Sequence, residues 1–149
     1  MSEDNTVNTQ PKVFIHTDGA CKRNGKKNSR GGWACVMVHG PHNEIHYGCE
    51  SGITNNQAEL LSVLLPMENL RYPSRVVLKN DSAYVVNNAH KHLSTWRNNG
   101  WKTQTGEPIK NRDLWERLDQ QLQRHDVQIR KVKGHRGDPG NECADWFAQ

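Results

Sequence analysis

The stretch HTDGACKRNG, from His16 to Gly25, closes one alternating segment and opens a basic loop. The alternation of apolar and polar residues before it predicts a strand over Lys12–Asp18. An Asp-Gly pair by itself most often marks a turn, because glycine adopts positive φ without steric cost. A functional role for Asp18 therefore needs support from acids elsewhere in the chain.

Length and charge limit the classes of protein to consider. A chain of 149 residues suits one compact domain, and its net charge of +4 weakly favours a polyanionic partner. Residues 1–10 are polar and unpatterned, which predicts a flexible tail before a single domain over residues 11–149.

The chain shows no sign of export or of a membrane span. No apolar run approaches the ~20 residues that a spanning helix needs, and the N-terminus has no apolar signal-peptide core. The four cysteines show no C-x-x-C spacing, which argues against zinc and favours reduced thiols. We therefore expect a cytoplasmic protein that does not associate with membranes.

Periodicity outlines a sheet with helices packed on it. Pro66 lies inside one helical pattern and is expected to kink or end that helix. The order of the elements predicts an α/β fold with a mixed sheet. Further strands are expected at residues 33–40, 44–50, 74–81 and 127–134, and helices at 54–70, from 82, at 111–125 and close to the C-terminus.

Four acids stand where they can meet. Asp18 and Asp81 end predicted strands, and ligands bind beyond the strand ends in open α/β sheets. Glu59 and Asp145 lie in predicted helices. Clustered carboxylates are costly without cations, and ligation by oxygen alone suits Mg²⁺ or Mn²⁺, two of which can act together on one phosphate. The alternative is four unrelated surface acids, which spacing alone does not exclude.

Six motifs in order decide between these alternatives. The chain resembles type 1 ribonuclease H from about Val13 to Ala148. The resemblance implies a ribonuclease H-like α/β fold, a mixed five-stranded sheet with helices on both faces. It also implies a monomeric endonuclease that hydrolyses the RNA strand of RNA/DNA hybrids by a two-metal-ion mechanism. The matching motifs are TDGAC, TNNQAEL, NDSAYV, WRNNGWKT, NRDLWERLD and VKGHRGDPGNECAD.

The resemblance also implies the catalytic residues. The family's mobile histidine, which assists proton transfer or product release, matches His135 in a glycine-rich loop. The family's metal ligands match Asp18, Glu59, Asp81 and Asp145.

Substrate contacts follow from the same motifs. Three asparagines match positions that read RNA 2′-hydroxyls, a basic protrusion with two tryptophans matches the part that holds the DNA strand, and a threonine and an asparagine match a DNA-phosphate pocket. Two alternatives stay open: Asn55 as a helix cap and Trp101 as a core residue. The three sets are Asn24, Asn55 and Asn56; Trp96, Arg97, Trp101 and Lys102; and Thr54 and Asn111.

Some positions depart from the family pattern. Gly52 stands where related enzymes often have arginine, His92 replaces an aromatic residue, and Asn80 replaces a common threonine. The last helix is short, which bears on stability rather than on chemistry. A non-catalytic hybrid-binding module on the same fold is the competing hypothesis. The acid set favours the enzyme, because a pure binder gains nothing from acids beside a polyanion.

Overall fold

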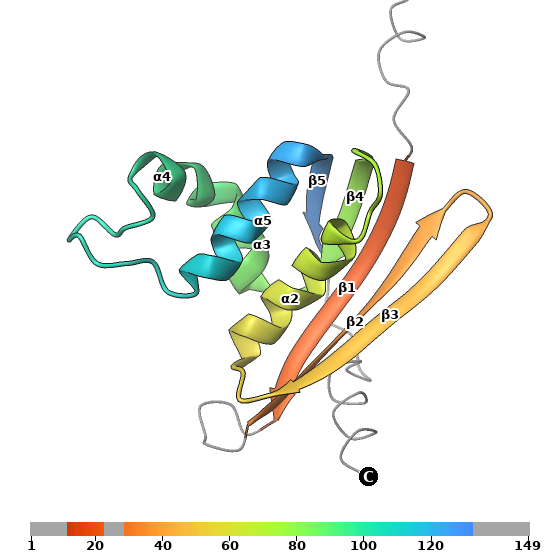
Figure 1. Ribbon diagram of the computed structural model, residues 1–149, viewed down its shortest axis with the longest axis horizontal. Coiled ribbons are helices and arrows are strands. Elements are labelled where there is room, and N and C mark those ends of the chain that lie inside the picture. The colour runs from red at the N-terminus through yellow and green to blue at the C-terminus, as the bar shows by residue number, and fades with distance from the viewer. Residues whose placement is uncertain (1–11, 23–28, 133–149) are drawn as a thin grey trace, which may run out of the picture.

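The computed structural model describes residues 12–22 and 29–132 (Figure 1). They form one five-stranded sheet in the order β3-β2-β1-β4-β5. The pairs β1/β2 and β2/β3 are antiparallel and the pairs β1/β4 and β4/β5 are parallel, so the prediction of a mixed sheet is confirmed. The strands are β1 (Lys12–Lys22), β2 (Arg30–His39), β3 (His42–Ser51), β4 (Arg75–Asn80) and β5 (Asp126–Lys131).

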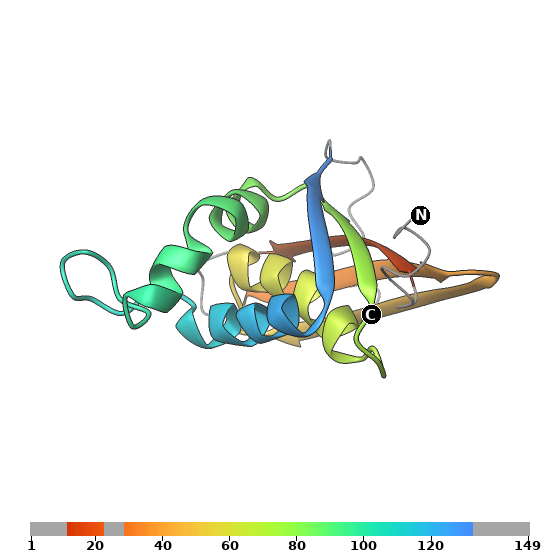
Figure 2. The same cartoon turned by 90° about the horizontal axis from the view of Figure 1, so that it is seen from above.

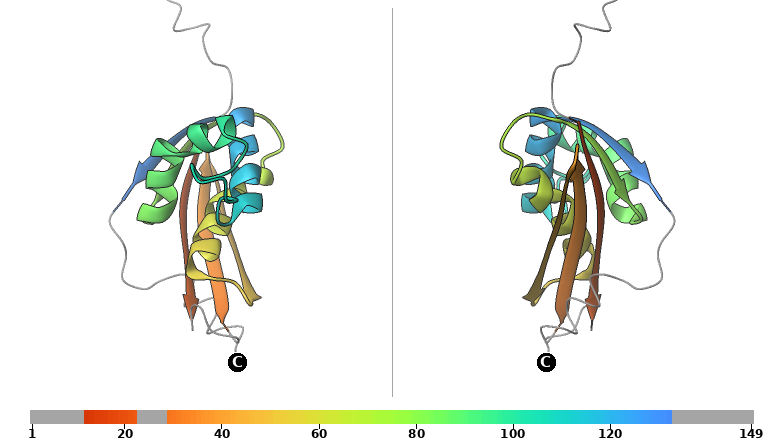
Figure 3. Two further views of the ribbon diagram at one scale, coloured as in Figure 1. Left: turned by 90° about the vertical axis from the view of Figure 1, so that its left-hand side faces the viewer. Right: turned by 90° about the vertical axis from the view of Figure 1, so that its right-hand side faces the viewer.

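β1 is longer than the sequence predicts. It passes Asp18 and continues to Lys22, and these last residues pair with β2 alone. The turn interpretation of the Asp-Gly pair is therefore wrong. The strands rotate steadily across the sheet, and β5 slants away from β1 in Figure 3.

Two helix starts and one proline illustrate how local sequence acts. Thr54 caps α2 through a capping box: its Oγ1 accepts from the Gln57 N–H (3.1 Å), and the Gln57 Oε1 accepts from the Thr54 N–H (2.9 Å). Of the two expected effects of Pro66, a kink or an end of the helix, the end is wrong, because α2 continues two residues further. Ser82, at which a helix is predicted to begin, caps α3: its hydroxyl oxygen accepts from the Val85 N–H. The described helices are α2 (Asn55–Glu68), α3 (Ala83–Lys91), α4 (Leu93–Asn98) and α5 (Arg112–Arg124).

One face of the sheet carries the main core. Ile15 of β1 and Leu78 of β4 are buried there against Leu64 of α2 and Trp115 of α5, and Figure 2 shows α2 and α5 stacked beside the sheet. Burying such side chains contributes roughly 1.5–3 kcal/mol each. The helices thus hold β1 and β4 in place, and these two strands carry two of the predicted acids.

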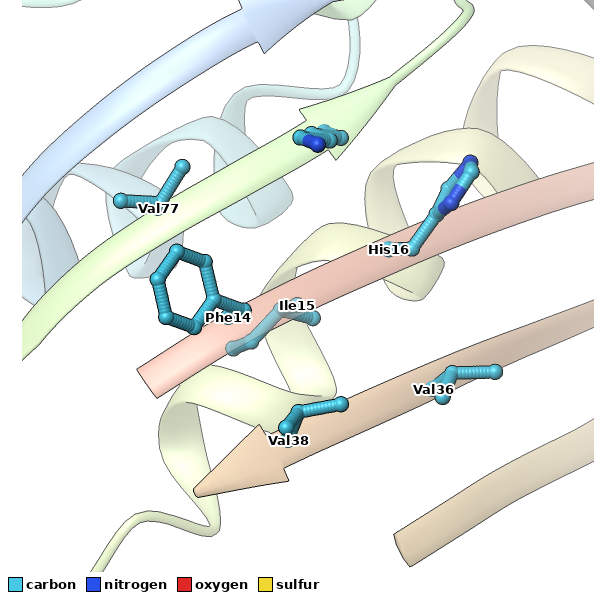
Figure 4. A pocket seen from close by; sticks show the side chains of 7 residues that line it. Phe14, Ile15, His16, Val36, Val38 and Val77 are labelled. Carbon is cyan, nitrogen blue, oxygen red and sulfur yellow. The ribbon is translucent and has the colours of Figure 1, made fainter. Parts of the chain in front are cut away.

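The opposite face is open in the described part of the chain. Phe14 is 45% exposed and Val36 44%, and with Val38 and Val77 they line a hollow of about 310 Å³ (Figure 4). The helix predicted close to the C-terminus lies outside the described residues. That part of the fold prediction stays a prediction.

His125 joins α5, β5 and the end of α2. Its Nδ1 accepts from the Ser74 N–H (3.0 Å), and its Nε2 lies 3.2 Å from the carbonyl oxygen of Met67. Burial lowers the pKa of this imidazole below its usual value, and the neighbouring Arg124 acts in the same direction. The histidine is therefore neutral in the folded protein near pH 7.

Two further observations concern the cellular setting. None of the described helices is long and apolar enough to cross a membrane. Cys49 is disulfide-bonded, so the expectation of reduced thiols is wrong at this residue, whereas Cys35 is a buried free thiol. Burial raises the pKa of the Cys35 thiol to about 11, which leaves it unreactive near neutral pH.

Candidate active site

Three of the predicted acids meet where β1 and β4 separate. The parallel pairing of these strands ends at Thr17 and Asn80, so Asp18 and Asp81 follow at the same edge of the sheet. Carboxylate oxygens of Asp18, Glu59 and Asp81 all lie within 4.8 Å of one another. Asp18 and Glu59 are buried and Asp81 is half-buried. The arrangement fits the strand-end location that the sequence indicates.

Gly19 is the reason that Glu59 can reach this cluster. The Gly19 N–H donates to Glu59 Oε1 at 2.9 Å. A Cβ at Gly19 would lie 2.4 Å from the carbonyl oxygen of Ala58, far inside van der Waals contact. Glycine therefore lets the backbone of α2 lie directly on β1. Sequence reasoning missed this role, because it explained the glycine by a turn.

The donor set decides which ions suit the site. Within residues 12–22 and 29–132, three carboxylates supply oxygen ligands only, the set that Mg²⁺ and Mn²⁺ prefer, and the group contains no thiolate or imidazole of the kind that selects zinc. The predicted ligand Asp145, the predicted proton-transfer residue His135 and the predicted RNA-strand residue Asn24 lie outside the described residues.

The N-terminus of α2 carries three of the predicted substrate residues. Because Thr54 is the cap, the alternative role of Asn55 as the cap is excluded; Asn55 is the first residue of the helix. Asn55 and Asn56 are both half-buried. Both stand in the helix turn before Glu59, so this element joins the expected RNA-reading positions to a metal ligand.

Asn111 is held from two sides beside this helix. It adopts a left-handed conformation (φ 61°), and its side chain makes no cap hydrogen bond to α5. Its Oδ1 instead accepts from Gln57 Nε2 and its Nδ2 donates to the Tyr84 hydroxyl, both at 3.1 Å. The Tyr84 hydroxyl also accepts from Trp115 Nε1 at 3.1 Å.

A hollow of about 490 Å³ lies beside Asn111. It is lined by Gln57, Asn111 and the first turn of α5, residues 112–114. First-turn N–H groups lack partners within their own helix and favour anions. Of the two residues predicted for the phosphate pocket, Asn111 lines this hollow, whereas Thr54 caps α2 and contacts Gln57, which also lines it. Sequence reasoning did not assign Gln57 or Tyr84, the two residues that hold the Asn111 side chain, to this pocket.

The tryptophans of the protrusion, here defined as residues 92–110, are part of the core as well. Trp96 packs edge-on against Trp115 with ring centroids 5.3 Å apart, and His92 stacks on Trp96 at 5.9 Å. Trp101 packs against the same core and adopts a positive φ of 63°, a strained conformation for an aromatic residue. The core alternative for Trp101 therefore holds for part of its side chain.

Arg97 is tied to α5. Its Nε donates to both carboxylate oxygens of Asp119 (3.2 and 3.0 Å) and its NH2 group donates to Oδ1 at 2.9 Å. Asp119 is buried, and its hydrogen bonds raise the pKa of the Arg97 guanidinium further. Lys102, by contrast, is exposed. The two bases that the sequence treats alike thus have different surroundings.

Comparison with known proteins identifies the family. The RNase H family model matches residues 10–149. The chain belongs to the RNase H family. It is 43% identical over 136 residues to a ribonuclease H of Alcanivorax borkumensis, and the aligned part covers 91% of this chain and 88% of the relative. It is 45% identical over 138 residues to ribonuclease HI of Caulobacter vibrioides, with coverage of 93% and 91%.

Solved structures agree on the RNase H fold. The crystal structure of LC9-RNase H1, described as a type 1 RNase H with the type 2 active-site motif, superposes with a TM-score of 0.76 at 28% identity. The superposition covers 95% of this chain and 72% of that one. The solution structure of the PFV RNase H domain gives a TM-score of 0.63 at 22% identity, with coverage of 96% and 94%, and supports the fold alone.

Family membership fixes the class of reaction. RNase H enzymes are metal-dependent endoribonucleases that hydrolyse the RNA strand of RNA/DNA hybrids, and this chain shares that activity. The carboxylate cluster is compatible with the metal dependence. The recognition of the family, the α/β fold and the enzyme class predicted from the sequence are confirmed.

Proposed function

We propose that the chain hydrolyses the RNA strand of hybrids at the cluster of Asp18, Glu59 and Asp81, with Asp145 as a fourth ligand. The convergence of three carboxylates within 4.8 Å on two strands and a helix carries this proposal. The proposed cofactor is Mg²⁺, with Mn²⁺ as a substitute, and two ions per site when substrate is bound.

Each of the proposed catalytic side chains has a separate role in holding the metals or moving a proton. When bound, two divalent ions supply an acidified water and neutralise charge at the leaving oxygen of the phosphate. The carboxylates of Asp18 and Asp81 hold the strand-end side of the site. Glu59, fixed by the Gly19 N–H, holds the helix side. His135 accepts or returns a proton at the scissile phosphate, or speeds product release.

Recognition of the RNA strand is assigned to amide groups near the acids. Asn24, Asn55 and Asn56 offer both donors and acceptors, which a 2′-hydroxyl can satisfy in both directions. The position of Asn55 and Asn56 one turn before Glu59 supports this assignment. A hybrid read there would place its neighbouring phosphate over the carboxylates.

A DNA-strand phosphate is assigned to Thr54, the cap of α2, and to Asn111, which lines the neighbouring hollow. Thr54 Oγ1 accepts a hydrogen bond from the Gln57 N–H, so its own hydroxyl proton can be donated to an anion. The N-termini of α2 and α5 both favour negative charge. Gly52 supplies no cation here, so we expect a weaker pocket than in relatives with arginine at this position.

The DNA strand beyond the pocket is assigned to the protrusion. Exposed Lys102 attracts a phosphate, and the outer surfaces of Trp96 and Trp101 offer faces on which sugars can pack. Arg97 is kept in this set as a residue whose main partner in the free protein is Asp119.

The setting completes the proposal. We expect a cytoplasmic monomer in which residues 1–10 form a flexible tail and residues 11–149 the catalytic domain. The family match over residues 10–149 supports the domain boundary. Size-exclusion chromatography with light scattering tests the monomer.

Cleavage assays with matched duplexes test the function. Labelled RNA/DNA, DNA/DNA and RNA/RNA duplexes of one sequence are incubated with and without Mg²⁺. We expect cleavage of the RNA strand of the hybrid alone, and only with the metal. Hybrid binding without cleavage in Mg²⁺ and in Mn²⁺ would instead indicate a binding module.

A further inference from the structure

Asn80 is a fully buried amide directly beside the acid cluster. It precedes Asp81, and it forms the last register pair between β4 and β1 with Thr17, which precedes Asp18. Its Nδ2 donates to Thr17 Oγ1 at 2.7 Å, and its Oδ1 accepts from the Ser82 N–H at 2.7 Å. One side chain thus joins the residue before one acid to the residue after the other.

The position of this link bears on the acids themselves. Successive side chains on a strand point to opposite faces, so Thr17 and Asn80 lie on the helix-covered side, and each is followed by an acid. The link fixes the spacing of the two strand ends and the path of the backbone at Asp81. Any change in that spacing alters the distance between the carboxylates of Asp18 and Asp81.

The Asn80 side chain is polar although it lies in an apolar core, and its amide makes hydrogen bonds there. The preceding inward positions of β4 are apolar: Val76 and Leu78 are buried in the same core. A buried amide costs free energy unless its hydrogen bonds are made, and here both ends of the amide have partners. Apolar packing alone would leave the Thr17 hydroxyl and the Ser82 N–H without these bonds.

We propose that Asn80 is a positioning residue for the metal site, and that its amide holds Asp18 and Asp81 at the separation a divalent ion requires. The inference rests on the proposed assignment of these acids as metal ligands. Asn80 touches neither metal nor substrate and acts through the two strand ends. It also gives a role to a residue that departs from the family's common threonine.

Asn80→Leu tests the proposal, because leucine has nearly the same size but makes neither hydrogen bond. Mn²⁺ affinity of the substrate-free chain is measured by titration calorimetry, and the Mg²⁺ midpoint of hybrid cleavage by activity. We expect both to weaken about tenfold or more, the effect typical of residues that orient metal ligands. The KM for hybrid at saturating Mg²⁺ should stay within about twofold of the unmodified chain.

Two variants separate positioning from stability. Val76→Ala lies on the same strand and removes core packing, so it should lower Tm and leave Mn²⁺ affinity unchanged. The double variant Thr17→Val/Asn80→Leu replaces two bonded partners by apolar groups, which recovers part of the lost stability. Its Mn²⁺ affinity should nevertheless stay as weak as that of Asn80→Leu.

The outcomes are distinct. Unchanged Mn²⁺ affinity and Mg²⁺ midpoint in Asn80→Leu would overturn the proposal, as would a parallel loss of affinity in Val76→Ala at equal Tm. If Asn80→Leu does not fold, Thr17→Val alone, which removes one hydroxyl, must weaken Mn²⁺ binding. Mn²⁺ binding that is equally strong in Asp81→Asn would overturn the assignment of the metal site itself.

Discussion

The acid cluster and the protrusion are built in opposite ways. The three carboxylates come from β1, α2 and β4, and the pairing of two strands and a helix packed against them brings the carboxylates together. The protrusion is held by side chains: the Arg97–Asp119 ion pair and the contact of Trp96 with Trp115.

This difference suggests that catalysis and hybrid binding depend on separate parts of the molecule. The acid cluster depends on the whole sheet, so it tolerates no shift of a backbone element. The protrusion, which stands away from the sheet in Figure 1, depends on a few contacts and tolerates change in steps. Substitutions in the first region should therefore affect kcat, and substitutions in the second should affect hybrid affinity.

The largest effect is expected at Asp81. Asp81→Asn keeps the shape of the side chain but removes one anionic ligand, so cleavage should be abolished while hybrid binding in Ca²⁺ persists. Steady-state kinetics, binding in Ca²⁺ and circular dichroism measure the three properties. The matched control is Asp126→Asn, an exposed acid at the start of β5, which should leave all three unchanged. Near-native turnover in Asp81→Asn would show that catalysis does not depend on the acid cluster.

A pair of glycine variants probes the two regions with the same chemical change. Gly19→Ala forces the backbone of α2 away from β1, and a displacement of about 1 Å can lower kcat by about 10²-fold. Gly106→Ala, in the protrusion loop, meets no atom within 4 Å; it only strains a positive φ and should leave kcat unchanged. Equal losses of kcat would show that backbone placement is no more critical at the cluster than in the protrusion.

The two bases of the protrusion should differ in salt dependence. Lys102→Ala should reduce the slope of log Kd against log salt by about 1, the effect of one lost phosphate contact. Arg97→Ala should change the slope less, because Asp119 already neutralises this charge, and should lower Tm by leaving a buried carboxylate unpaired. Hybrid binding in Ca²⁺ at several salt concentrations measures both slopes. Equal slopes would mean that Arg97 leaves Asp119 for the phosphate.

The smallest effect concerns the stability of the fold as pH falls. It should change neither the turnover at the acid cluster nor the hybrid binding by the protrusion. The pKa of His125 is lowered in the folded state, so its contribution is complete above the unfolded value of ~6.5 and is lost as pH falls through the folded pKa. Urea unfolding between pH 7.5 and pH 5 should show a steeper loss in the unmodified chain than in His125→Gln. At pH 7.5 the two chains should have the same kcat and the same affinity for hybrid. A selective loss of hybrid binding in His125→Gln would link His125 to the protrusion.

Sequence patterns locate side chains but not their partners. Local patterns placed Asp18 and Asp81 at strand ends and Glu59 in a helix, and the resemblance to the family assigned the three acids to one metal site. The start of α2 is marked by local residues that can cap a helix, Thr54 and Asn55, and the structure shows that Thr54 is the cap. The partnership of Arg97 with Asp119 spans 22 positions and that of Asn80 with Thr17 spans 63, and neither leaves a local pattern.

Glycine was the clearest source of error. Gly19 next to an acid and several bases has the composition of a turn, but the requirement it meets is room for α2, an element 40 positions away. Asn111 shows a similar effect: it stands at the cap position of α5, but its side chain makes no cap hydrogen bond and is bound to Gln57 and Tyr84. In both cases the tertiary contact overrides the local preference.

The Gly19 amide has a consequence for observing the enzyme at work. Beyond Asn80 no β4 residue pairs with β1, and the Gly19 N–H donates to a helix carboxylate instead. Its hydrogen can exchange with solvent only when Glu59 turns away or α2 lifts from the strand. The exchange rate of this one amide, followed by NMR, therefore measures how often the catalytic centre opens. The measurement needs neither substrate nor a labelled nucleic acid.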